Sequence, residues 1–158
     1  MAYKYTNKNN ISLALAVFLM HDSYDYDDRA NVISATGLLK SIRQIVLAHQ
    51  NKDLAKTVDI SDLVPSRMGT AIHNGCEEAW LDRKNVLEAL KVFGAADSVT
   101  DSIRVNPETP VPGEMPVYVE QRAEKEVPGI NDAFDLPIIV SGKYDLVLDG
   151  VLNDYKST

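Results

Sequence analysis

An Asp-Gly dipeptide at residues 149 and 150 constrains the fold of this 158-residue chain more than any other feature. It separates two β-prone runs, and Asp-Gly in that setting favours a two-residue hairpin turn. The turn also fixes the register, so that Leu148 faces Val151 and Asp145 falls directly opposite Asp154. We therefore predict a β-hairpin near the C-terminus that carries two adjacent carboxylates.

Adjacent carboxylates on one face of a sheet repel each other, and a raised pKa or a bound cation relieves the repulsion. Because side chains alternate along a strand, Lys156 shares the face of Asp145 and Asp154. Hard oxygen ligands at this density suit Mg²⁺ or Mn²⁺. The simpler alternative is that both aspartates face solvent on the wet side of an antiparallel sheet. The other face is expected to enter the core, with Tyr144, Leu146, Leu148, Val151 and Tyr155.

Residues 1–94 are predicted to be mainly helical. The apolar run 11–20 predicts a helix that packs inside, and Ser34 to Thr36 can cap a second helix. A third helix is expected to start at Ser66, and a shorter one covers 86–93 and stops at Gly94. The apolar positions that set the second and third helices are Leu38, Leu39, Ile42, Ile45 and Val46, then Met68, Ile72, Cys76 and Trp80.

Residues 95–116 are predicted to form a loop, because prolines and a glycine crowd the stretch from Asn106 to Pro116. Residues 117–158 are predicted to form a β-sheet that includes the hairpin. We expect one domain over residues 1–158, of the α/β (α+β) class, in which N-terminal helices pack on a small mixed sheet.

The formal net charge of -7 argues against a protein that holds nucleic acid by a general basic surface. The single cysteine, Cys76, excludes an internal disulfide framework and favours a reducing, intracellular setting. The run 11–20 follows two lysines, as in a secretory signal, but no small-x-small cleavage site follows it. It is also shorter than the ~20 residues that span a bilayer, so no membrane association is expected.

Asp145 followed by the triplet Asp154-Tyr155-Lys156 on a hairpin resembles the core of the PD-(D/E)XK nuclease superfamily. Upstream, Gly69 and His73 lie one helical turn apart, which is similar to the metal-binding helix of the RecB-like exonuclease branch. The stretch from Ser34 to Lys40 also looks like the segment that opens the nuclease core in this branch. The resemblance covers roughly residues 34 to 158, except that residues 84–116 match nothing in the family.

The resemblance implies a fold of the restriction-endonuclease-like type and a DNA exonuclease of recombination or repair that uses Mg²⁺ or Mn²⁺. Asp145 and Asp154 would hold the metal, and Lys156 would be the catalytic lysine that orients and activates water. His73 would be a further metal ligand, and the backbone carbonyl of Tyr155 another. An ordinary half-buried helix histidine is the alternative for His73.

Weaker candidates for acids near the metal are Glu77, on the helix of His73, and Glu120, which shares a strand face with Glu124. The implied partners are DNA, a recombination or annealing protein and a second copy of the chain. The implied location is the cytoplasm, that of the host cell if the protein is encoded by a phage.

Nucleases of this branch usually continue past the lysine into another helix and strand, whereas this chain stops at Thr158. The fold is therefore expected to lack its C-terminal helix. A truncated chain, a remainder carried on another chain and a natural fragment all fit this departure. Together with the acidic charge, it supports an alternative function, a truncated or inactive nuclease-fold module that acts through protein-protein interaction.

Overall fold

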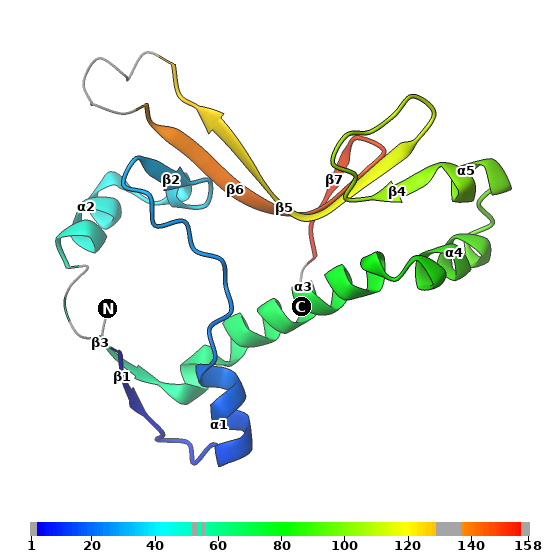
Figure 1. The fold of residues 1–158 in the computed structure, drawn as a ribbon. Helices are drawn as coiled ribbons and strands as arrows, with labels where there is room; N and C mark the ends of the chain where they lie inside the picture. The colour runs from blue at the N-terminus through cyan, green and yellow to red at the C-terminus, as the bar shows by residue number, and fades with distance from the viewer. Residues whose placement is uncertain (1–2, 52–53, 55, 129–136, 156–158) are drawn as a thin grey trace. The chain divides into compact units, whose positions relative to one another are not determined.

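The computed structural model describes residues 3–51, 54, 56–128 and 137–155 (Figure 1). Its backbone contacts divide the chain into two compact units, Met1–Thr70 with Glu124–Gly142, and Ala71–Ala123 with Lys143–Thr158. Helices accompany a mixed sheet, so the predicted α+β class is confirmed. The prediction of one domain stays a prediction. Along the described part of the chain, no helix has the length and apolar character needed to cross a bilayer.

The first unit contains a two-stranded parallel sheet, in which β1 (Tyr3–Thr6) pairs with β3 (Lys56–Asp59). Helix α1 (Leu13–Met20) packs on the 3₁₀ helix η2 (Ile60–Leu63) and buries Ala16 and Leu19. The prediction that this helix is buried was wrong for most of its surface, because Leu13 is 80% exposed and Val17 is 65% exposed. Among the described residues, Ala16 and Leu19 are the buried positions of α1, although the helix is apolar all round.

The predicted start of the second helix at residues 34–36 was also wrong, although a helix does cover Ile42, Ile45 and Val46. Strand β2 (Val32–Ser34) pairs in parallel with the first residues of β6 (Ile139–Leu148), and a 3₁₀ helix η1 (Gly37–Leu39) follows. The Ser34 hydroxyl accepts a hydrogen bond from the Gly37 N–H at 3.0 Å. Helix α2 (Ile42–Gln50) begins only after a capping box in which Ser41 and Gln44 bond each other's backbone N–H groups.

Helix α3 (Val64–Leu81) begins two residues before the predicted cap at Ser66, whose hydroxyl donates to the Leu63 carbonyl instead. Helix α4 (Arg83–Val92) starts at an Asp82 cap that accepts two backbone N–H groups, and Gly94 ends it with a positive φ of 72°. The described part of α3 also contributes to both units, since the unit boundary falls after Thr70.

The larger sheet has the strand order β2-β6-β5-β4, and β7 (Val151–Asn153) pairs with β6. Strand β4 (Ile103–Val105) runs parallel to β5 (Met115–Glu126), whereas β7 runs antiparallel to β6. The predicted loop 95–116 was wrong in its first part, because α5 (Asp97–Ser102) and β4 lie there. The core of the second unit is made of buried residues from α4 and the strands, namely Val86, Ile103, Val117, Val119 and Leu146.

Candidate metal centre

The β6-β7 hairpin positions the first carboxylate of the site. Its register pairs Leu148 with Val151 and Leu146 with Asn153, as predicted from the Asp-Gly turn. Asp149 and Gly150 have φ values of 50° and 73°, so both turn residues adopt the left-handed backbone that such a turn requires. One further step along this register leads to Asp145 and Asp154, which lie just beyond the last recorded pair.

Asp145 is held from several sides. Its Oδ2 accepts the backbone N–H of Tyr155 at 2.6 Å, and its side chain is 12% exposed. Burial raises the pKa of Asp145, because the charged form loses water. The neighbouring Asp154 carboxyl raises this pKa further, whereas the Tyr155 N–H and His73 act in the opposite direction. A bound cation would oppose both effects, because it favours the charged form of the carboxyl.

His73 reaches the same place from α3. The positions 73, 76, 77 and 80 are half-buried, and they repeat at the spacing of one helix face. The His73 Nδ1 lies 2.8 Å from Glu120 Oε1 and 3.3 Å from Asp145 Oδ1. Trp80, two turns further along this face, packs on the hydrophobic core and fixes this end of the helix against the strands.

Glu120 enters the site from β5 in an unusual backbone conformation. Its φ is 51°, a value that non-glycine residues rarely adopt, and a strand residue in this conformation interrupts the regular pairing. Its side chain is only 6% exposed, and Lys143 Nζ lies 3.0 Å from its Oε2. A buried carboxylate thus contacts an imidazole through one oxygen and an ammonium group through the other.

Three elements therefore bring together one potential ligand atom each from His73, Glu120 and Asp145, all within 4.8 Å of one another. One imidazole nitrogen and two carboxylate oxygens form a donor set without a thiolate. Carboxylates suit Mg²⁺ and Mn²⁺, and imidazole is accepted by Mn²⁺ more readily than by Mg²⁺. The residues that are present thus fit a hard divalent cation. Asp154, which was also expected to bind the metal, raises the pKa of Asp145 but does not belong to this group of ligand atoms among the described residues.

Several residues named from the sequence lie elsewhere or have other contacts. Glu77 is half-buried one turn beyond His73 and does not belong to the group of ligand atoms found among the described residues. The Tyr155 side chain packs on the hydrophobic core and its backbone N–H donates to Asp145, while the role of its carbonyl as a metal ligand stays a prediction. Lys156 lies outside the described residues.

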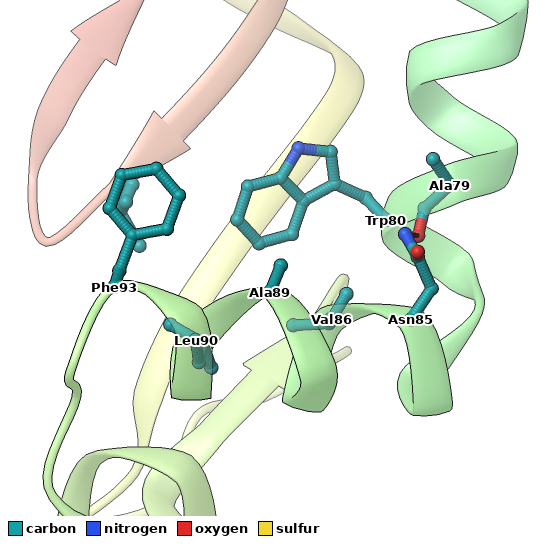
Figure 2. A pocket seen from close by; sticks show the side chains of 8 residues that line it. Ala79, Trp80, Asn85, Val86, Ala89, Leu90 and Phe93 are labelled. Atoms are coloured by element: carbon teal, nitrogen blue, oxygen red, sulfur yellow. Dashed lines mark hydrogen bonds between the residues drawn. The ribbon is translucent and has the colours of Figure 1, made fainter.

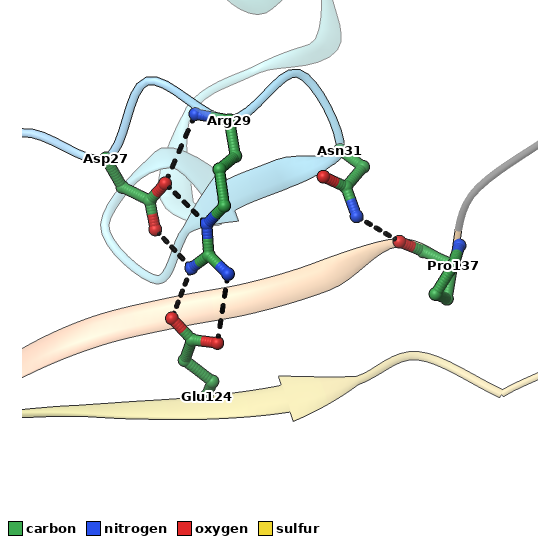
Figure 3. A network of polar contacts seen from close by, with 5 residues as sticks. All are labelled: Asp27, Arg29, Asn31, Glu124 and Pro137. Atoms are coloured by element: carbon green, nitrogen blue, oxygen red, sulfur yellow. Dashed lines mark hydrogen bonds and ion pairs between the residues drawn. The ribbon is translucent and has the colours of Figure 1, made fainter.

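Glu124, expected on the strand face of Glu120, belongs to a network in the first unit (Figure 3). Its carboxylate pairs with the Arg29 guanidinium, which also binds Asp27 at 2.6 Å. Asn31 anchors the same segment by donating to the Pro137 carbonyl at 2.7 Å. Glu124 therefore has a structural partner, whereas Glu120 faces the candidate site.

Lys143 is the residue of the site that sequence reasoning missed. It precedes Asp145 by two residues on β6, and residues two apart on a strand share a face. That spacing was sufficient to place it beside Asp145.

The expected core face of the hairpin also needs one correction, since Leu146 is buried but Val151 is 62% exposed. Val151 directly follows the turn, in a strand of three exposed residues.

An apolar pocket of about 460 Å³ also lies in the second unit, and it is separate from the carboxylates. Figure 2 shows the Trp80 indole extending from α3 over α4, above Val86 and Ala89, with the Phe93 ring at the other end. Its lining has no titratable side chain among the described residues, so it offers shape and apolar surface without acid-base or metal chemistry.

Comparison of the chain with protein-family models, with curated proteins and with solved structures found no match.

Proposed function

We propose that this protein is a Mg²⁺- or Mn²⁺-dependent deoxyribonuclease of the PD-(D/E)XK type, related to the RecB-like exonucleases. The observation that supports it best is the convergence of His73, Glu120 and Asp145 within 4.8 Å, with Asp154 beside Asp145. The first three come from α3, β5 and β6, and Asp154 follows β7. The resemblance of the sequence names His73, Asp145 and Asp154 as metal ligands. A chance cluster of surface acids would not be expected to draw a helix histidine and a 6% exposed glutamate together.

In this proposal His73, Glu120, Asp145 and Asp154 would hold the metal. A divalent cation supplies Lewis-acid polarisation of a phosphoryl oxygen and lowers the pKa of a bound water. The Tyr155 N–H keeps the Asp145 carboxyl oriented by donating to its Oδ2. Lys156 would orient the attacking water, whose oxygen bonds to phosphorus as the bond to the leaving oxygen breaks and a proton passes to that oxygen.

The charge of the protein makes DNA binding depend on this site. A net charge of -7 gives little general attraction for a polyanion, so contact with phosphate must come from the metal and from nearby cations. Lys143 is such a cation, since its ammonium group already lies at the carboxylates. We therefore expect DNA binding to require the divalent ion.

The test combines calorimetric titration with Mn²⁺ and a cleavage assay on linear DNA. We expect the wild type to bind Mn²⁺ and to cleave, and Asp145→Asn and His73→Ala to weaken binding by roughly tenfold or more and abolish cleavage. Glu78→Gln, which removes an exposed carboxylate from the same helix as His73, is the control and should leave both unchanged. Absence of Mn²⁺ binding by the folded wild type, or cleavage that survives Asp145→Asn, would refute the proposal.

A second candidate is a non-catalytic module of the same fold that binds a protein partner. The observation in its favour is the number of large apolar side chains exposed on α1 and α2, with Leu13 at 80% and Ile42 at 81%. The same titration separates the two candidates. The module predicts no Mn²⁺ binding and no cleavage at any metal concentration.

A further inference from the structure

We propose that Asn106 is the positioning residue that holds β5 in the conformation through which Glu120 enters the candidate metal centre. As far as it concerns metal binding, this inference rests on the proposed function. It assigns to a residue 14 positions upstream in the sequence the task of placing a metal ligand. Asn106 itself contacts none of His73, Asp145 or Lys143 in the recorded hydrogen bonds and ion pairs of the described residues.

Asn106 continues the β4-β5 pairing with its side chain. Strand β4 ends at Val105, which pairs with Val117, and the Asn106 N–H then donates to the Val117 carbonyl at 2.7 Å. Beyond that point, the Asn106 Oδ1 accepts the Val119 N–H at 2.8 Å and its Nδ2 donates to the Val119 carbonyl at 3.2 Å. The carboxamide has a donor and an acceptor side by side, so it satisfies both backbone groups of Val119 as a neighbouring strand would.

The residue held in this way directly precedes the irregular one. Val119 is fully buried and both of its backbone polar groups bond to Asn106, whereas Glu120 has a φ of 51°. A left-handed glutamate is disfavoured because of its β-carbon, so it persists only where the surroundings determine it. The two hydrogen bonds from Asn106 secure the backbone on the N-terminal side of the kink, and the contacts of the Glu120 carboxylate with His73 and Lys143 secure the side chain.

The choice of asparagine at this position has two physical reasons. Asn106 has a φ of 47°, a left-handed conformation that asparagine tolerates better than most other residues with a side chain. Among the residues with this tolerance, only asparagine carries a carboxamide that both donates and accepts. Aspartate lacks the donor, and glycine lacks the side chain.

The experiment uses Asn106→Gly, which keeps the left-handed backbone and removes only the carboxamide. Its matched control is Asn10→Gly, because Asn10 is exposed in the first unit and has a similar φ of 53°. We expect Asn106→Gly to weaken Mn²⁺ binding between about 10- and 100-fold, the range found for groups that orient metal ligands. Asn10→Gly should bind Mn²⁺ as the wild type does, and equal affinity for Asn106→Gly and the wild type would overturn the inference.

A double-mutant cycle distinguishes positioning from general loosening of the fold. If Asn106 acts through Glu120, Asn106→Gly should weaken Mn²⁺ binding no further in a chain that already carries Glu120→Gln. In a His73→Ala chain the effect of Asn106→Gly should persist. Independent, multiplying losses in the Glu120→Gln chain would mean that Asn106 acts elsewhere. Should Asn106→Gly fail to fold, Asn106→Asp retains the acceptor and the backbone preference, and the same cycle applies to it.

A metal-free measurement separates failure of this inference from failure of the proposed function. The ring resonances of His73 in an NMR spectrum report the presence of Glu120 at 2.8 Å. Asn106→Gly should move them in the same direction as Glu120→Gln does, and Asn10→Gly should not move them. If the wild type binds no Mn²⁺, the metal centre is refuted while these resonances still decide the role of Asn106. Unmoved resonances in Asn106→Gly would refute that role.

Discussion

At position 120, glycine is predicted to give a more stable protein than alanine, the reverse of the usual order in a strand. Both Glu120→Gly and Glu120→Ala remove the carboxylate and therefore its contacts with His73 and Lys143. The two variants differ only in the β-carbon. Because Glu120 has a φ of 51°, alanine would retain the steric conflict of the left-handed backbone, and glycine would relieve it.

The magnitude follows from two opposing effects. A β-carbon in the left-handed region costs about 1 to 2 kcal/mol. Glycine loses more backbone entropy on folding, which costs roughly 0.5 to 1 kcal/mol relative to alanine in a strand. The difference leaves the glycine variant more stable by about 1 kcal/mol. With a urea dependence of ~2 kcal/mol per molar for a protein of this size, the unfolding midpoint should be higher by about 0.5 M.

Urea unfolding followed by tryptophan fluorescence measures the difference in stability between Glu120→Gly and Glu120→Ala in the second unit. Trp80 is the single tryptophan and packs on the core that includes Val117 and Val119. Ala123→Gly, three residues further along β5 at an exposed position, is the control and should lower the midpoint, since its backbone has no positive φ. A Glu120→Ala variant as stable as Glu120→Gly, or more stable, would refute the strained backbone at position 120.

Three further predictions follow from the contacts of single residues. Lys143→Met should tighten Mn²⁺ binding about fivefold in calorimetric titration. It removes an ammonium group that competes with the metal for Glu120, and this ion pair, whose lysine is 27% exposed, is taken to contribute ~1 kcal/mol. Asp59→Asn should lower the thermal unfolding midpoint at pH 7. Hydrogen bonds from the Lys8 N–H, Ser61 and Thr6 hold the pKa of Asp59 well below its usual range, so its stabilisation is present above the unfolded pKa near ~4 and is lost as the pH falls through the folded value. The difference between the two proteins should therefore shrink on acidification, and a constant difference would contradict this origin. Val117→Ala removes two methyl groups from a fully buried side chain and should cost about 2 kcal/mol in urea unfolding.

The elements that could be predicted from the sequence are those determined by local chemistry. The Asp-Gly turn fixed the β6-β7 register because a two-residue turn permits only one pairing. The end of α4 at Gly94 was predicted for a similar reason, since a left-handed residue after a helix satisfies its last carbonyls. In both places the determining residues lie within a few positions of the structure that they determine.

Elements that depend on distant partners were not predictable in this way. Residues 34–46 have helical apolar spacing, yet Ser34 belongs to a strand because β6, more than a hundred residues later, supplies its pairing partner. Strand β4, placed inside an expected loop, likewise depends on β5. Strands of three or four residues carry too few side chains for an alternating pattern to be recognised.

The candidate site depends on local chemistry at the hairpin and on a contact between distant segments at Glu120. The register that pairs Leu148 with Val151 and Leu146 with Asn153 could be predicted by counting along the hairpin, whereas the pairing of Asp145 with Asp154 stays a prediction. The assumption of regular alternation grouped Glu120 with Glu124, but the two have different partners, His73 and Lys143 for Glu120 and Arg29 for Glu124, and the backbone of Glu120 is left-handed. That irregularity depends on Asn106, whose own signal in the sequence is only an asparagine between a β-prone run and a proline. The left-handed backbone of Glu120 on β5 needs hydrogen bonds from outside β5, and Asn106 supplies them. The alternating pattern along β5 therefore cannot reveal the residue that positions this ligand.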